Sequence, residues 1–121
     1  MTTSGTTINP LPGELVLLPF PFTDLSGNKR RPVLVLAAAD TLGDFIAVPV
    51  TSQPGHSGFI SLGSQQLADG ALPKDSWIKA DKPFTLNRSL VLKRFASVKQ
   101  ELLHDVKRQL CARIGCAEAR A

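Results

Sequence analysis

The order of the hydrophobic patterns along the chain is the feature that most constrains its fold. Short apolar runs separated by turn residues come first, and a single helical pattern closes the chain. In that last segment an apolar residue recurs every four positions, as on the buried face of an amphipathic helix, at Val98, Leu102, Val106 and Leu110. Strands that do not alternate with helices are typical of an antiparallel sheet. The pattern therefore predicts a mainly β fold, a small antiparallel barrel with one C-terminal helix packed on it.

The candidate strands are short and differ in how they are expected to be buried. They cover residues 14–22, 33–38, 45–50, 59–62, 77–80 and 89–95. Pro19 and Pro21 remove two backbone donors from the first run, which favours an edge strand or a bulged strand. The second run is continuously apolar, so both of its faces should be buried. Residues 63–75 and 81–88 are interpreted as irregular connections.

The final helix and the domain boundaries are also predicted from local signals. Ser97 and Gln100 fit a capping box, which places the helix at about residues 97–114, and Gly115 is a natural stop. A chain of 121 residues is enough for one compact domain. We therefore expect a flexible tail over 1–12, one domain over 13–115 and a short tail over 116–121.

Composition narrows the classes of function. The net charge of +4 permits an anionic partner without requiring one. Cys111 and Cys116 are too few for a disulfide framework, and the two histidines, His56 and His104, have no zinc-ligand spacing. No apolar run approaches the roughly twenty residues of a membrane span, and the N-terminus does not resemble a secretory signal. These features lead us to expect a reducing cytoplasmic setting, no membrane, no metal and no cofactor.

Three segments resemble the PemK/MazF family of toxin–antitoxin ribonucleases over about residues 13–115. They are GELV at 13–16 with KRRPVLVL at 29–36, then VPVTSQ at 48–53, and WIKADK at 77–82. The resemblance implies an SH3-like barrel, a homodimer, and metal-independent, sequence-selective cleavage of single-stranded RNA. The implied products are a 2′,3′-cyclic phosphate and a 5′-hydroxyl. It also implies a cognate antitoxin protein whose flexible segment lies across the RNA groove.

The resemblance also assigns the candidate catalytic residues Arg31, Thr51 and Asp81. Arg31 matches the arginine before proline, and its guanidinium offers a planar fork of donors for phosphate while staying protonated. Thr51 ends a strand, where its hydroxyl can donate to a phosphate oxygen. Asp81 is the candidate for proton transfer. Each has a simpler interpretation: a solvated arginine, a polar strand end, and a turn residue before Pro83.

The candidate RNA-binding residues are Lys29, Arg30, Ser52, Gln53, Trp77 and Lys79. In an extended 77–81 segment, Trp77, Lys79 and Asp81 share one face, which suits base stacking and phosphate contact. Packing of Trp77 against the helix or in a dimer contact is the alternative. Lys79 stands where some relatives have arginine, so a catalytic duty there is in doubt. We interpret the basic pair at 93–94 as a solvated face of the barrel.

Two other functions remain open from the sequence. One is a binding module of the same fold without nuclease activity, such as a gyrase-inhibiting toxin. The other is a structural barrel domain detached from a larger RNA-handling assembly. The pairing of Arg31 with Thr51 argues against the gyrase inhibitor, because binding gyrase requires no phosphate-directed pair.

Overall fold

The computed structural model describes residues 8–19, 30–55 and 58–116. This part of the chain forms eight strands, two short 3-10 turns and one α-helix. The strands are β1 (Glu14–Pro19), β2 (Arg30–Ala37), β3 (Asp44–Thr51), β4 (Phe59–Leu62), β5 (Leu67–Gly70), β6 (Ser76–Lys79), β7 (Phe84–Asn87) and β8 (Lys93–Val98). The 3-10 turns are η2 (Ser64–Gln66) and η3 (Arg88–Leu90), and the helix is α1 (Gln100–Ile114). The predicted mainly β fold with one C-terminal helix is confirmed.

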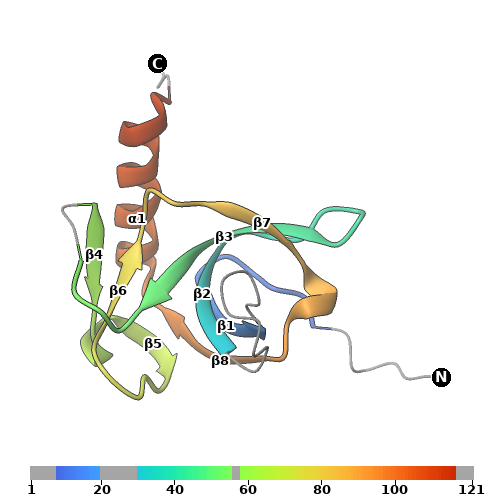
Figure 1. The fold of residues 1–121 in the computed structure, drawn as a ribbon, viewed down its shortest axis with the longest axis horizontal. Helices are drawn as coiled ribbons and strands as arrows, with labels where there is room; N and C mark the ends of the chain where they lie inside the picture. The colour runs from blue at the N-terminus through green and yellow to red at the C-terminus, as the bar shows by residue number, and fades with distance from the viewer. Residues whose placement is uncertain (1–7, 20–29, 56–57, 117–121) are drawn as a thin grey trace.

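The strands form one curled antiparallel sheet in the order β4-β6-β3-β2-β1-β8-β5, with β7 paired to β3 (Figure 1). The curl depends on β3, which changes partner along its length. Its first residues pair with β7, whereas Val50 and Thr51 pair with Ile78 and Trp77 of β6. Because β3 changes partner in this way, β4 and β6 form one branch of the sheet and β7 forms another. No helix in the described part of the chain is long and apolar enough to cross a membrane.

The curled sheet encloses two hydrophobic clusters, and β2 contributes to both. Leu34 and Leu36 belong to the cluster that α1 covers, whereas Val33 and Val35 belong to the second cluster around Phe45. The apolar run is therefore buried on both faces, as predicted. The predicted apolar stripe is confirmed on α1 at Leu102 and Val106, which are buried with Leu103 on the first cluster, whereas Val98 is the last residue of β8.

The first strand is bulged but does not lie at an edge. β1 pairs with β2 on one side and with β8 on the other, and its register with β8 shifts between Leu15 and Val16. Pro19 is the last residue of β1, where its missing N–H costs the ladder least. Of the two alternatives, the edge strand is wrong and the bulged strand is right. Pro21 lies outside the described residues.

Both segments that we interpreted as irregular contain strands. Residues 63–75 include β5, which pairs with β8, and residues 81–88 include β7, which pairs with β3. Each strand has only four residues, and β5 has none that is fully buried. Such short strands are formed by pairing with a distant partner, so their own sequence carries little hydrophobic alternation.

The start of α1 was misplaced by its apparent capping box. Ser97 belongs to β8 and pairs with Glu14, so the helix begins at Gln100 after Lys99, which makes no side-chain capping bond. The end is as predicted, because Gly115 adopts the left-handed conformation at φ 74° and its N–H donates to the carbonyl of Cys111. Cys111 and Cys116 are joined by a disulfide across this end, which does not fit the reducing setting expected from the sequence.

Candidate functional site

Arg31 and Thr51 lie in one cavity of about 640 Å³. Its walls come from β1, β2, β3 and β8 and from the connection between β5 and β6. Among the described residues that line it there are four cations and no carboxylate; the cations are Arg30, Arg31, Lys74 and Lys93. A concave surface with that charge attracts an anion such as phosphate. We call it the cationic cavity.

Arg31 occupies the second position of β2, opposite Leu18 of β1. Its side chain is half-buried, whereas the neighbouring Arg30 is exposed. Within the described part of the chain neither guanidinium forms an ion pair. Because the backbone of Arg31 is fixed in the ladder, its donors are held near the cavity without an internal anion to neutralise them.

Thr51 ends β3 and is fixed by a local hydrogen bond. The backbone N–H of Gln53 donates to Oγ1 of Thr51 at 3.1 Å. A hydroxyl that accepts this bond keeps its own proton free to donate. Ser52 and Gln53 also line the cationic cavity and are exposed. The strand end therefore presents a pre-positioned donor on the same cavity as Arg31.

Lys93 is a cavity residue that the sequence reasoning missed. Leu17 of β1 pairs with Lys93 of β8 on one side and with Pro32 of β2 on the other. This pairing places Lys93 near the residue that follows Arg31. The adjacent Arg94 belongs to a different environment, with its Nε 3.0 Å from a Glu14 oxygen and its Nη2 2.8 Å from an Asp69 oxygen. Both side chains are exposed, as expected of a solvated basic pair, but they do not form one basic face.

The ion pairs of Arg94 change the acidity of their partners. Hydrogen bonding from Arg94 lowers the pKa of the Asp69 carboxyl below its ordinary value of 3.8. The same bond raises the pKa of the Arg94 guanidinium. Since this guanidinium is already neutralised by two carboxylates, Arg94 has less charge to offer to a phosphate than Lys93 has. The alternation of side chains along β8 would have predicted this separation, because neighbouring residues of a strand point to opposite faces.

The predicted face is confirmed by burial within β6, whereas Asp81 lies in the turn that follows the strand. Ile78 and Ala80 are fully buried, whereas Trp77, Lys79 and Asp81 are only partly buried. Trp77 therefore lies on the face opposite to the one that packs toward α1, which removes helix packing as the explanation for this residue. The ammonium of Lys79 lies 5.7 Å from the ring centre of Phe59, within the range of a cation–π contact.

Asp81 does not line the cationic cavity. The only residue of β6 that lines the cavity is Ser76, its first residue, and Asp81 follows two residues after the strand ends at Lys79. The Asp81 carboxylate lies beside Gly58, and its Oδ2 is 3.9 Å from Nε of Arg113 on α1. Its Oδ1 is buried without a hydrogen-bond partner among the described residues.

The remaining candidates are distributed unevenly. Trp77 and Lys79 lie outside the cationic cavity, although Trp77 pairs directly with Thr51 across the β3–β6 ladder. Lys29 and His56 lie outside the described residues. The cavity thus brings together five of the residues expected from the sequence, and it adds two lysines; the five are Arg30, Arg31, Thr51, Ser52 and Gln53.

Comparison with known proteins identifies a family. Residues 11–114 match the family model described as PemK-like, MazF-like toxin of type II toxin–antitoxin system. A comparison with curated proteins gives no significant match. Among solved structures, MazF (Form-I) from Deinococcus radiodurans is 28% identical with a TM-score of 0.71, and the match covers 90% of this chain and 99% of that one.

Two further solved structures are similar in fold. The MazE-MazF structure (Form-II) from Deinococcus radiodurans is 27% identical with a TM-score of 0.72, covering 91% of this chain and 99% of that chain. An endoribonuclease from Mycobacterial species, at 15% identity, has a TM-score of 0.70 over 94% of this chain and 99% of its own. Because the family model matches nearly the whole domain, the chain belongs to the PemK-like, MazF-like toxins of type II toxin–antitoxin systems.

Proposed function

We propose that this protein is the toxin of a type II toxin–antitoxin pair and acts as an endoribonuclease on single-stranded RNA. The observation that carries the proposal is the cationic cavity, whose described residues bring Arg31 and Thr51 together with three further cations and without a carboxylate. The family match and the structurally similar mycobacterial endoribonuclease support it. RNA cleavage in the cell interior is consistent with the expected cytoplasmic location.

The chemistry uses a nucleophile that RNA itself supplies. The 2′-oxygen attacks the adjacent phosphorus, a new O2′–P bond forms, and the P–O5′ bond breaks. The products are a 2′,3′-cyclic phosphate and a 5′-hydroxyl, and the proton lost from the 2′-hydroxyl is balanced by the one gained at O5′. Because this route needs no activated water, we propose that it proceeds without a metal ion.

Arg31 and Thr51 have distinct tasks in that reaction. The Arg31 guanidinium donates to phosphate oxygens as negative charge develops on them. The free Thr51 proton donates to a second phosphate oxygen, and the bond from the Gln53 N–H keeps the hydroxyl oriented for this. Asp81 is not included among the groups that act at the phosphate, because it lies away from the cationic cavity.

The proposal includes two protein partners. We propose a homodimer and a separate antitoxin, and the D. radiodurans MazE-MazF structure supports the second of these. An antitoxin segment that carries carboxylates would be attracted to the same four cations as RNA. Such a segment would inhibit the toxin by competition for the cationic cavity.

The test compares Arg31→Ala with Arg108→Ala on a mixed-sequence RNA. Arg108 is an exposed arginine of α1 that pairs with Asp105 and lies outside the cationic cavity. Loss of a charge-stabilising donor costs about a hundredfold or more in rate, so Arg31→Ala should be that much slower while Arg108→Ala stays at the wild-type rate. Equal rates for the wild type and Arg31→Ala would refute the assignment, provided that both variants have the wild-type thermal midpoint.

Thr51 is tested separately with one substitution that keeps the hydroxyl and one that replaces it with a methyl group of the same shape. Thr51→Ser keeps the hydroxyl, and we expect it to retain most of the activity. Thr51→Val removes the donor and should lower the cleavage rate more than Thr51→Ser does. If the two variants are equally active, the hydroxyl has no part in catalysis.

A further inference from the structure

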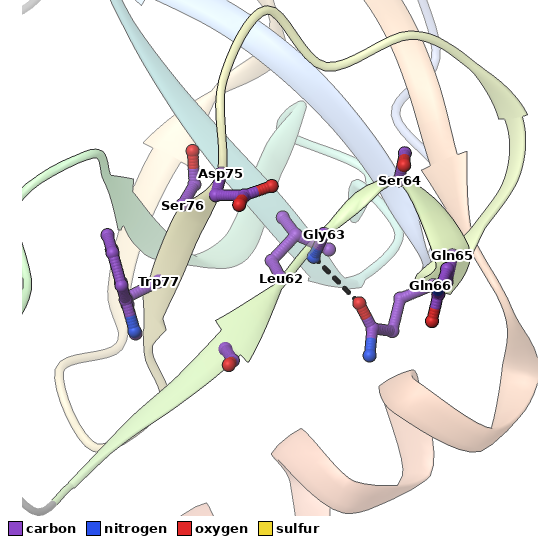
Figure 2. A pocket seen from close by; sticks show the side chains of 9 residues that line it. Leu62, Gly63, Ser64, Gln65, Gln66, Asp75, Ser76 and Trp77 are labelled. Carbon is purple, nitrogen blue, oxygen red and sulfur yellow. Dashed lines mark hydrogen bonds between the residues drawn. The ribbon is translucent and has the colours of Figure 1, made fainter.

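A second cavity, of about 330 Å³, lies beside the cationic cavity. It is formed by the end of β4, the η2 turn and the start of β6. Figure 2 shows Trp77 at one end and Gln65 and Gln66 at the other, with Asp75 between them. The Gly63 N–H donates to the Gln66 amide oxygen at 2.7 Å, which fixes the far rim. Its volume lies at the lower end of the range of about 300–1,000 Å³ that is typical of small-ligand pockets.

The charges of the two cavities are opposite. The cationic cavity has four cations and no carboxylate among its described lining residues. Among the described residues that line the second cavity there is no cation, and the one charged group is the Asp75 carboxylate. A phosphate would be repelled from such a cavity, whereas a neutral nucleobase with N–H donors at its edge would be attracted.

Three consecutive residues connect the two cavities. Lys74 lines the cationic cavity, Asp75 lines the second one, and Ser76 lines both. The Ser76 hydroxyl donates to the Lys74 carbonyl at 3.0 Å and its side chain is buried, so this turn is locally fixed. In addition, Trp77 of the second cavity pairs with Thr51 of the cationic cavity across the β3–β6 ladder. Residues directly opposite in such a ladder have Cβ atoms about 5 Å apart.

We propose that the second cavity is a nucleobase subsite that selects guanine next to the phosphate held in the cationic cavity. This inference rests on the proposed function and adds a specificity to it. Unstacked RNA bases are recognised by stacking on aromatic side chains and by hydrogen bonds to their edges. Trp77 supplies the aromatic surface, and it is partly exposed. Asp75 supplies two acceptor oxygens.

Guanine is the base that matches a carboxylate. Its N1–H and its exocyclic amino group are adjacent donors, so both can bond to the two oxygens of Asp75. Adenine and cytosine each place one amino donor beside an acceptor, and uracil has a single N–H between two carbonyls. A carboxylate would therefore make one favourable bond to these bases and meet a repelling acceptor at its second oxygen.

The experiment uses the tryptophan of the subsite as its own probe. Trp77 is the single tryptophan of the chain, so quenching of its fluorescence reports on a base that stacks there. The ligands are the 2′-O-methyl oligonucleotides UUGUU, UUIUU and UUAUU, which cannot be cleaved because the 2′-oxygen is blocked. Inosine differs from guanosine by the missing amino group. We expect quenching by UUGUU and binding about tenfold tighter than that of UUIUU, since a hydrogen bond to an exposed charged group contributes about that factor.

The matched variants are Asp75→Asn and Asp105→Asn. Both replace an exposed aspartate with its neutral isostere, and Asp105 lies on α1 outside both cavities. Asp75→Asn should abolish the difference between UUGUU and UUIUU, while Asp105→Asn should preserve it. Equal binding of all three oligonucleotides to the wild-type protein would overturn the subsite, and so would an unchanged preference in Asp75→Asn.

Two other outcomes separate this proposal from its alternatives. If Trp77 is covered by a second copy of the chain, RNA will not quench its fluorescence and Trp77→Ala will dissociate the dimer, which would overturn the subsite. If the wild-type protein fails to cleave RNA but still shows guanine-dependent quenching, the proposed nuclease activity is wrong and the subsite is supported.

Discussion

Removal of the Lys93 ammonium should weaken RNA binding and make that binding less dependent on salt. The size of the change in salt dependence follows from the number of cations in the cationic cavity. Four cations in the described part of the chain line the cationic cavity, and each one that neutralises a phosphate of single-stranded RNA contributes about 0.7 to the slope of log K against log salt. The wild-type slope at this site is then about −2.8, and that of Lys93→Ala is about −2.1. Arg94 contributes no further increment, because Glu14 and Asp69 already neutralise it.

The assay is fluorescence anisotropy with a labelled 2′-O-methyl RNA over a series of sodium chloride concentrations. Lys107→Ala is the matched control, since Lys107 is an exposed lysine of α1 and lies outside the cationic cavity. We expect the control to keep the wild-type slope. The reasoning is refuted if Lys93→Ala keeps the wild-type slope, or if Lys107→Ala lowers it by the same amount.

The remaining predictions concern stability. Because bonding to Arg94 lowers the folded-state pKa of Asp69, this carboxylate stabilises the fold above its ordinary pKa, and the contribution is lost as the pH falls through the lowered value. Asp69→Asn should therefore lower the urea midpoint at neutral pH and have no effect in strong acid; a constant difference at all pH values would contradict the ion pair. Gly70→Ala should destabilise by more than about 2 kcal/mol, because φ is +83° and a Cβ would lie 2.5 Å from the Ala96 Cα. Gly115→Ala, with φ +74° but no described neighbour within 4 Å of the new Cβ, should lower the free energy of unfolding by only about 1 kcal/mol. Equal losses for Gly70→Ala and Gly115→Ala would exclude the predicted clash at Gly70.

Several elements could be predicted because local patterns and tertiary packing agree there. Leu102 and Val106 of the predicted stripe are buried on α1, and the glycine at the end of the helix is in place. The buried run of β2 is another case, since a continuously apolar strand is stable only when both of its faces are covered. At these positions the sequence contains the whole physical reason for the structure.

Other elements depend on contacts that no local pattern contains. Ser97 has the residue types of a helix cap around it, but pairing of β8 with β1 holds it in a strand instead. β5 and β7 are strands because they form hydrogen-bonded pairs with β8 and β3, which are distant in the sequence. Their own residues are exposed or half-buried, so they show no hydrophobic pattern typical of a strand. Tertiary pairing therefore overrides local propensity at both places.

The candidate site was predicted best where two strands present their ends to the same cavity. Arg31 and Thr51 were identified from their family motifs, and the curl of the sheet explains why they meet. Asp81 was expected to share a face with Trp77 on an extended segment, but β6 ends at Lys79 and Asp81 lies in the turn that follows. Lys93 was missed for a related reason, since only the registers of β1 place it beside β2.

The central claim is tested most directly by incubation of the pure protein with a mixed-sequence RNA in excess EDTA, followed by analysis of the fragment ends. The account predicts fragments with a 2′,3′-cyclic phosphate and a 5′-hydroxyl, and far fewer of them with Arg31→Ala. Intact RNA at high protein concentration would contradict the nuclease and favour a binding module of the same fold. Fragments with a 5′-phosphate would contradict attack by the 2′-hydroxyl.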